Sequence, residues 1–301
     1  MRFRRLIEFQ LQCLFTPRRE VGVVRRLLHF FFALALTPRT VLRVRRWARA
    51  IETAPRQTID GPETCCVIVL SYRRPANIPW IVLSYLKCDF VGKVVVTNNN
   101  PAVDLKSYLE GIDDPRLELV QQTQPTKQGI RFALAEKHSG KFEYFFSPDD
   151  DRFLVPQQIR KLFAGLVAEP EVPHGIEGES RVPRVDAKTY PFVVGTVRDG
   201  RTDHLTGYYA FTRLHLRRCL ETFRGLGWTR PEAVGNGEDI VLSFSGDGQP
   251  RIHDLGPILQ CESWSLAGVA TWQTHQNFFE ERAALHDRLA DRRRSYAAAL
   301  R

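Results

Sequence analysis

The sequence lacks a hydrophobic run long enough to cross a membrane. Its longest uncharged apolar run covers residues 27–36, about half of the ~20 residues that a transmembrane helix needs. No small-residue cleavage site precedes Arg39, although a secretory signal peptide would require one. We therefore expect the N-terminal region not to span a bilayer, and we keep targeting or anchoring through a membrane as an alternative.

Paired cysteine motifs are also absent. Cys65 and Cys66 are neighbours in an expected strand, where successive side chains point to opposite faces, so they are badly placed to share a disulfide. We expect reduced thiols and a cytosolic setting. The six cysteines, which include no Cys-x-x-Cys pair, are Cys13, Cys65, Cys66, Cys88, Cys219 and Cys261.

Most of the chain has no excess of positive charge. The net charge is +9, but residues 1–50 hold 12 arginines against Glu8 and Glu20, a net of +10. The remaining 31 basic and 32 acidic residues sum to −1. Because nucleic-acid binding depends on neutralising many phosphates, we expect no nucleic-acid partner.

The basic segment, residues 1–60, interleaves arginine pairs with leucine, phenylalanine and tryptophan. This pattern is typical of an amphipathic helix that lies on an anionic lipid surface. We expect a cytoplasmic protein held peripherally on a membrane. Two alternatives stay open: the segment packs on the body of the protein, or it serves as an anchor that places the protein in the Golgi or ER lumen.

From Pro62 onward, buried strands alternate with helices. CCVIVLSY and GKVVVTNNNP contain continuous apolar runs rich in β-branched residues, which predict strands buried on both faces. Apolar residues at helical spacing lie between these runs and again in residues 159–167. The order β-α-β-α-β-α-β predicts an α/β fold, with a mainly parallel sheet flanked by helices.

Polar residues follow three of the expected strands, in residues 71–74, 97–100 and 148–151. Ligands bind at the carboxyl ends of strands in open α/β sheets, so we expect these segments to converge. Neither GxGxxG nor GxxxxGK[ST] follows the first strand, which gives a dinucleotide fold or a P-loop little support.

Three adjacent carboxylates, Asp149, Asp150 and Asp151, occupy the third segment. They repel one another unless a positive group lies among them. Oxygen ligands without a nearby His or Cys suit Mg²⁺ or Mn²⁺ better than zinc. A solvated Ser-Pro-Asp turn is the alternative.

Six stretches in this order resemble the exostosin-type glycosyltransferase domain, glycosyltransferase family 64. They are CVIVLSYRRPANIPWIVLSYL, KVVVTNNNP, FFSPDDDRFL, TGYYAFTRLHL, NGEDIVLSF and FFEERAAL, and the resemblance covers about residues 64–290. It implies a GT-A-like (Rossmann-like) fold, a nucleotide-sugar donor and a manganese cofactor. The acidic triplet is weakly specific alone, and its pairing with NGEDIVLSF is the stronger signal.

The resemblance also implies roles for the residues at the strand ends. Tyr72 and Arg74 would meet the nucleotide, as would Asn99 and Asn100; simple turns are the alternative for both pairs. Arg131, with Lys127 as a further candidate, would face the diphosphate, and a solvated helix face is the alternative there.

For the acidic triplet, the resemblance implies that Asp149 contacts the ribose and that Asp150 lies beside it in the nucleotide-sugar site. Asp151 would bind the metal, Mn²⁺ or Mg²⁺, that holds the diphosphate.

The resemblance places two further residues at the reacting centre. Asp239 would lie near the anomeric carbon, where a carboxylate stabilises a cationic transition state or deprotonates the acceptor. Helix capping is its alternative role. Arg282 would compensate charge on the leaving diphosphate. Asp239→Asn is expected to spare folding. His275 departs from the family spacing, so a role as a metal ligand has little support.

We therefore expect a basic segment at residues 1–60, a GT-A-like domain at 61–290 and a basic helical tail at 291–301. The expected reaction transfers a sugar to a hydroxyl of a glycan or other acceptor, with retention implied by the resemblance. Alternatives are an inverting family-2-type transferase, a metal-dependent nucleotidyltransferase, and a lectin-like or scaffolding protein on an inactive transferase fold. Sugar, base and acceptor are not determined by any motif.

Overall fold

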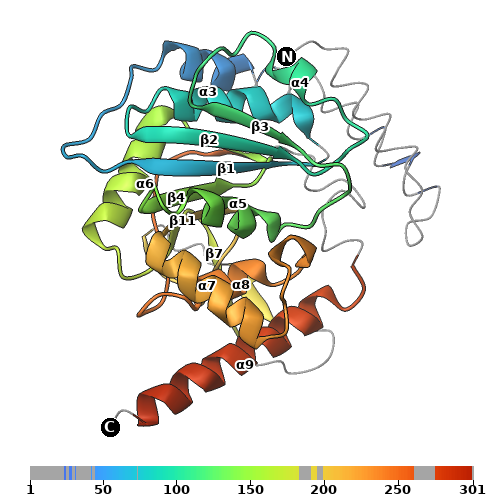
Figure 1. Cartoon of the computed structure of the whole chain (residues 1–301), viewed down its shortest axis with the longest axis vertical. Coiled ribbons are helices and arrows are strands. Elements are labelled where there is room, and N and C mark those ends of the chain that lie inside the picture. Colours follow the sequence, from blue (N-terminus) through green and yellow to red (C-terminus); the bar gives the residue numbers. More distant parts are fainter. Residues whose placement is uncertain are drawn as a thin grey trace.

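The computed structural model describes residues 45–72, 74–182, 191–194, 199–260 and 275–299, and a few isolated residues before them. Figure 1 shows a twisted central sheet with helices on both sides. The α/β fold predicted from the sequence is confirmed. Cys13 and Cys261 lie outside the described residues.

Four parallel strands form the first half of the sheet, in the order β3-β2-β1-β4. Every residue of β1 is buried, because helices cover both of its faces. The expected strands after Pro62 are therefore confirmed. The four are β1 (Cys65–Ser71), β2 (Val91–Asn98), β3 (Leu117–Gln121) and β4 (Tyr144–Pro148).

The two faces of β1 belong to two separate apolar cores. Cys65, on one face, packs with the core under α3 and α6, whereas Cys66 packs on the opposite face with the core under α5, α7 and α8. This placement confirms that the two thiols point apart, and both are free. The helices of the first half are η1 (Pro75–Asn77), α3 (Ile78–Leu86), α4 (Lys106–Leu109), α5 (Ile130–His138) and α6 (Pro156–Ala168).

The second half continues the same sheet in mixed directions. The strand β11 (Tyr208–Thr212) pairs antiparallel with β4, and β6, β12 and β9 follow it. This antiparallel step brings elements of the second half to the end of β4. The strands beyond β11 in this sheet are β6 (His174–Gly175), β12 (Arg251–Ile252) and β9 (Gly200–Arg201). A second sheet contains β10 (His204–Leu205), β7 (Gly178–Arg181) and β8 (Phe192–Val194), and a third pairs β13 (Leu259–Gln260) with β5 (Arg152–Phe153).

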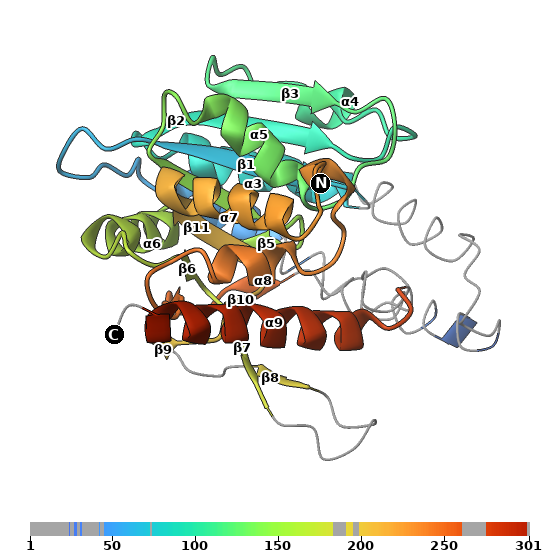
Figure 2. The ribbon, with the colours of Figure 1, turned by 60° about the horizontal axis from the view of Figure 1, so that its bottom comes forward.

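Three helices cover this half: α7 (Arg213–Gly225), α8 (Glu238–Ser243) and α9 (Phe278–Ala299), with the short η2 (Pro231–Ala233) before α8. In Figure 2, α9 runs below α7 and α8, and the β7–β8 ribbon projects beyond it. The expected boundary at residue 290 falls within α9, which is one continuous helix.

The end of the basic segment packs against the body. Residues 45–53 are helical; Trp47 contacts the core beside α3, and Ile51 is fully buried. Lys87 also donates hydrogen bonds to the carbonyl oxygens of Glu52 and Ala54, at 2.6 and 2.9 Å. Among the described residues, no helix is both long and apolar enough to span a membrane.

Candidate active site

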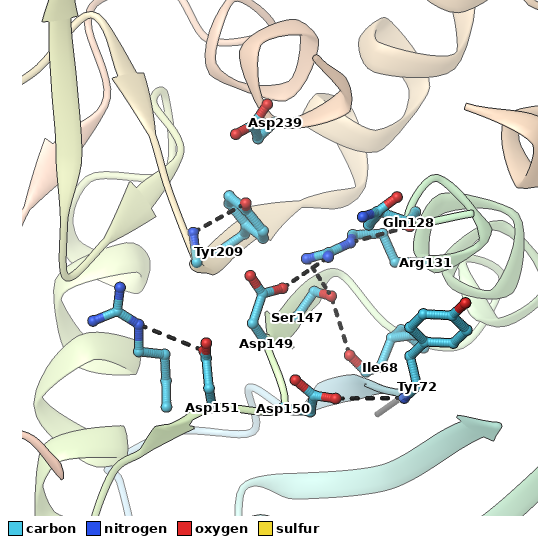
Figure 3. Close-up of polar contacts among 12 residues, drawn as sticks. Ile68, Tyr72, Gln128, Arg131, Ser147, Asp149, Asp150, Asp151, Tyr209 and Asp239 are labelled. Carbon is cyan, nitrogen blue, oxygen red and sulfur yellow. Dashed lines mark hydrogen bonds and ion pairs between the residues drawn. The ribbon is translucent and has the colours of Figure 1, made fainter. Parts of the chain in front are cut away.

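The loops after β1, β2 and β4 meet at one edge of the sheet, as the sequence predicted. Figure 3 shows Tyr72, from the loop after β1, beside Asp150, from the loop after β4. The Tyr72 amide donates to Asp150 Oδ2 at 3.4 Å, and Asn77 Nδ2 donates to the Asp150 carbonyl at 2.8 Å. Asn100 Nδ2 donates to the Tyr72 carbonyl at 3.2 Å. The three polar segments therefore form one connected site.

Each carboxylate of the triplet has a guanidinium partner from a different part of the chain. Arg131 Nη2 lies 2.8 Å from Asp149 Oδ1, and Arg74 Nη1 lies 2.6 Å from Asp150 Oδ1 and 3.4 Å from Asp151 Oδ2. These guanidiniums supply the positive charge that three adjacent carboxylates require. The sequence suggested a metal ion as the positive group beside the triplet, and the structure shows that arginines also lie there.

The pKa of Asp151 is raised in the folded protein. Burial, together with the charges of Asp149 and Asp150, raises it to about 6, against the lowering effects of Arg74 and Arg152. A cation that approached Asp151 would relieve this repulsion, because it would favour the ionised form.

Arg131 is buried within the protein beneath the site. Its side chain is 1% exposed, bonds to Asp149 and to Ser147 Oγ at 3.3 Å, and lies over the ring of Tyr209 at 4.8 Å from the centroid. In this structure Arg131 orients Asp149, as Figure 3 shows. Direct contact with a diphosphate, which the sequence suggested for Arg131, would need this arrangement to open.

Asn99 is also turned inward. It is 4% exposed, and its side-chain oxygen accepts a hydrogen bond from Thr97 Oγ1 at 3.0 Å. Its backbone N–H donates a hydrogen bond to the Ser71 carbonyl oxygen at 2.8 Å. Asn99 therefore ties β2 to β1. Tyr72, by contrast, is exposed at the rim of the site.

Asp239 lies on the other side of Tyr209 from the triplet, at the start of α8 (Figure 3). Gly237 is the N-cap residue of α8; its φ of 85° favours glycine, and a Cβ there would lie 2.4 Å from Leu285 Cδ2 of α9. This close approach of α9 to α8 brings Arg282 to Asp239.

Asp239 and Arg282 form a buried bidentate ion pair. Nη1 and Nη2 of Arg282 lie 2.8 Å from Oδ1 and Oδ2 of Asp239, and the side chains are only 7% and 8% exposed. Burial alone raises the pKa of Asp239, but the charge and hydrogen bonds of Arg282 reverse this, and its pKa is lowered. Asp239 therefore carries a fixed negative charge.

The pKa of Glu238, beside Asp239, is shifted in the opposite direction. Burial and the charge of Asp239 raise the pKa of Glu238 to about 7, although Arg131 and Arg282 lower it. Two neighbouring carboxyl groups thus differ in protonation near neutral pH, which is a common arrangement at catalytic sites.

The described residues include no group of three or more His, Cys, Asp or Glu side chains that could hold a metal ion by themselves. Asp150 and Asp151 nevertheless offer carboxylate oxygens at the sheet edge. Mg²⁺ is often held by one or two carboxylates, with phosphate and water completing its shell. The residues present fit an ion shared with a diphosphate. His275 instead pairs with Glu281 at 2.7 Å.

Sequence reasoning missed Arg152, Glu177 and the structural role of Tyr209. Arg152 lies 3.7 Å from Asp151 and 2.6 Å from Glu177, so it links the triplet to the loop after β6. Its position next to the triplet was a signal, whereas nothing in the sequence pointed to Glu177.

No protein-family model matches the chain, and no curated protein matches it. Among solved structures, that of GalNAc-T7 with UDP, GalNAc and Mn²⁺ aligns with a TM-score of 0.47 and 11% identity, over 66% of this chain and 44% of that one. S. aureus TarS 1-349 aligns with a TM-score of 0.44 and 14% identity, over 65% of this chain and 59% of that one.

The chain thus spans less than two thirds of the length of either structure. Both likenesses are distant, and neither identifies a family, so the exostosin-type resemblance stays a prediction. The function proposed below rests on the geometry of the site.

Proposed function

We propose that this protein transfers a sugar from a nucleotide-diphosphate-sugar to a hydroxyl group of a glycan or other acceptor. One observation carries the proposal: the carboxyl ends of β1, β2 and β4 gather an acidic triplet with arginines, and the ion pair of Asp239 and Arg282 lies across Tyr209 from them. Such a site holds charged groups for a diphosphate and a separate carboxylate for a reacting sugar.

The nucleotide would lie over the rim of the sheet. Tyr72 and Asn100 are placed to contact it, and Asp149 would contact the ribose while Arg131 holds it in orientation. Arg74 already pairs with Asp150 and Asp151, so an approaching diphosphate would compete with these carboxylates for its guanidinium.

Asp151, with Asp150 beside it, would hold Mn²⁺ or Mg²⁺ together with the diphosphate. The ion would neutralise charge that develops on the leaving group. Arg152, which lies 3.7 Å from Asp151, adds positive charge at the same place.

Asp239 would act through its charge. Both of its oxygens are held by Arg282, and Oδ1 also accepts from the Ile240 amide at 2.8 Å, so its orientation is fixed. A fixed carboxylate beside the anomeric carbon stabilises an oxocarbenium-like transition state without reorganising. Arg282 keeps Asp239 ionised, and by the resemblance it also faces the diphosphate. Retention of configuration remains part of the proposal on the resemblance alone.

The test is a panel of UDP-glucose, UDP-galactose, UDP-N-acetylglucosamine and GDP-mannose with the full-length protein and Mn²⁺. We expect at least one donor to be hydrolysed slowly to free UDP or GDP when water serves as acceptor, and we expect EDTA to stop this. If no donor is cleaved, and nucleoside triphosphates release pyrophosphate instead, the nucleotidyltransferase alternative replaces the proposal.

We also propose that the basic segment holds the protein on an anionic membrane surface. Val24, Leu27, Leu28 and Phe31 are helical and 43–72% exposed, and their spacing places them on one helical face. The 12 arginines of residues 1–50 complement anionic lipid.

Deletion of residues 1–44 tests the membrane proposal. The cut falls before Trp47 and Ile51, because these residues pack on the body. We expect the full chain to sediment with phosphatidylserine vesicles and the truncated chain to stay in solution, with phosphatidylcholine vesicles as the control. Equal binding by both chains would contradict the proposal.

A further inference from the structure

We propose that Arg152 and Glu177 form the subsite that receives the donor sugar, and that Glu177 makes this subsite favour neutral sugars over uronic acids. The inference rests on the proposed function and deepens it, because it names the chemical class of sugar that the site accepts. Arg152 follows the triplet in the chain, and Glu177 lies in the loop between β6 and β7.

The sheet places the loop after β6 next in line after the triplet. The strand order continues from β4 through β11 to β6, and β6 runs in the same direction as β4 because both pair antiparallel with β11. At this edge the Asp149 N–H donates to the Gly207 carbonyl oxygen at 3.0 Å, and the Thr206 N–H donates to the Glu177 carbonyl oxygen at 3.1 Å. The short loop before β11 therefore connects Asp149 to Glu177.

The shape of the ligand matches this order of strands. A nucleotide-diphosphate-sugar is elongated, with the nucleotide at one end and the sugar at the other. In the proposed function the nucleotide lies over the ends of β1 and β2, and the diphosphate lies at the triplet, which follows β4. The next groups along the sheet edge belong to β11 and β6. The sugar of a donor bound in this way would therefore lie beside the loop after β6.

The side chains of Arg152 and Glu177 meet beside the triplet. Arg152 Nη2 lies 2.6 Å from Glu177 Oε2, and Arg152 Nε lies 3.7 Å from Asp151 Oδ1. The guanidinium also lies against Gly207, where an added Cβ would be 3.3 Å from Arg152 Nε. Arg152 is thus held between two carboxylates, and one of them, Asp151, is the proposed metal ligand. The Glu177 carboxylate is therefore separated from the proposed diphosphate position by one guanidinium.

The pair offers both kinds of group that a sugar hydroxyl needs. A carboxylate has about four acceptor positions, and a guanidinium has five N–H donors. Arg152 lies at one oxygen of Glu177, and the two side chains are 16% and 31% exposed, so a ligand has access to both. A hydroxyl can donate to Glu177 while a neighbouring oxygen accepts from Arg152, and hydrogen bonds to charged groups are the stronger kind.

The charge of the pair decides which sugar fits. The single positive charge of Arg152 is already shared between Asp151 and Glu177. The carboxylate of a uronic acid would add a third negative charge, whereas the hydroxymethyl group of a neutral hexose adds none. Like charges a few ångström apart near a protein surface repel enough to change an affinity by about tenfold or more. Repulsion of this kind is a common source of specificity.

The experiment measures donor binding by isothermal titration calorimetry, with the full-length protein and Mn²⁺ near neutral pH. Each neutral donor of the panel is compared with the uronic acid that differs from it only by a carboxylate at C6, for example UDP-glucose with UDP-glucuronic acid. In the wild type we expect the neutral donor to bind about tenfold or more tightly than its acid. In Glu177→Gln this ratio should fall by about tenfold, because Arg152 becomes available to the sugar carboxylate.

The ratio distinguishes recognition from a structural role. The two donors of a pair share the nucleotide and the diphosphate, so a structural effect of Glu177→Gln would weaken both alike. Glu169→Gln is the matched control. Glu169 is 32% exposed and pairs with Arg201, but it precedes β6, whereas Glu177 is 31% exposed and follows β6. Glu169→Gln should keep the wild-type ratio.

A second variant moves the ratio in the opposite direction. Arg152→Gln leaves the charges of Asp151 and Glu177 without the guanidinium between them, so it should disfavour the acid further. This variant tests the inference independently if Glu177→Gln does not fold.

The outcomes separate the inference from the proposed function. If the wild type binds neither UDP, GDP nor any donor of the panel, the proposed function fails and the inference fails with it. If the wild type binds donors but prefers a uronic acid, only the inference is overturned. The same holds if the ratio is equal in the wild type and Glu177→Gln, or, where that variant does not fold, in the wild type and Arg152→Gln.

Discussion

The two groups of carboxylates at the site differ in how their charge is balanced. Asp149, Asp150 and Asp151 share three arginines from separate elements and lie at the edge of the sheet, where partners can be exchanged. Among the described residues, Asp239 has one ion-pair partner, Arg282, which holds both of its oxygens in the interior. The first arrangement suits a site that binds a ligand, and the second suits one that keeps a charge in place.

The largest expected effect comes from breaking the buried pair. Arg282→Met leaves a buried carboxylate, and Asp239→Asn leaves a buried guanidinium, so each should cost about 3–5 kcal/mol of the free energy of unfolding. Each should also slow sugar transfer by about 10²-fold or more. Urea denaturation and turnover with the active donor measure the two effects.

The double variant and a control complete this experiment. Removing both charges should cost less than the sum of the single variants, because no isolated charge remains. Asp287→Asn breaks another α9 ion pair, Asp287 with Arg181 at 2.8 Å, which lies at the surface. It should change stability by at most about 1 kcal/mol. Additive costs for Asp239 and Arg282 would show that they are not coupled.

From the sequence, Asp239→Asn was expected to spare folding, because asparagine keeps the volume and most of the hydrogen-bonding capacity of aspartate. The buried ion pair with Arg282 leads us to expect a loss of stability instead. The pairing with Arg282 joins residues that are 43 positions apart, and it depends on the contact of α9 with Gly237. No local pattern contains this information.

The parallel strands and their polar ends, by contrast, were predictable. The continuous apolar runs of β1 and β2 predict that these strands are buried, and their alternation with helices predicts that they run parallel. The inward position of Arg131 was not predictable, because it depends on how α5 packs against β11. The sequence therefore predicted which residues gather at the site, but not which of them face a ligand.

The second prediction is that Asp151→Asn weakens donor binding more than it changes the free energy of unfolding. Asp151→Asn removes a charged ligand worth about 1.5–3 kcal/mol, which is roughly a ten- to hundredfold loss of donor affinity in the presence of Mn²⁺. In the wild type, donor affinity should fall as pH drops through about 6, because Asp151 takes up a proton there. Isothermal titration across pH measures both effects.

Asp151→Asn and Asp239→Asn are expected to change the free energy of unfolding in opposite directions. The pKa of Asp151 is raised from 3.8 to about 6 in the folded protein, so its ionisation weakens the wild type as pH rises between these values. Asp151→Asn should therefore be at least as stable as the wild type at pH 8. A loss of several kcal/mol would mean that the triplet is a structural cluster like the Asp239 pair.

The smallest expected effect is the change in Mn²⁺ affinity caused by Arg74→Gln. It tests whether the triplet exchanges its partners or is held as firmly as Asp239. Arg74 competes with any cation for Asp150 and Asp151, to which it lies 2.6 and 3.4 Å away. Without the guanidinium, Mn²⁺ alone should bind up to about fivefold more tightly, which corresponds to ~1 kcal/mol for a pair near the surface. Donor affinity should fall instead, because Arg74 would no longer be available to the diphosphate.

The two changes are separated by measuring Mn²⁺ binding through the electron spin resonance signal of the ion, with and without UDP. Opposite shifts for ion and nucleotide would mark the triplet as a site whose partners are exchanged on binding. If both affinities fall together, Arg74 positions the carboxylates for the metal, and the triplet is as fixed as the pair of Asp239 and Arg282.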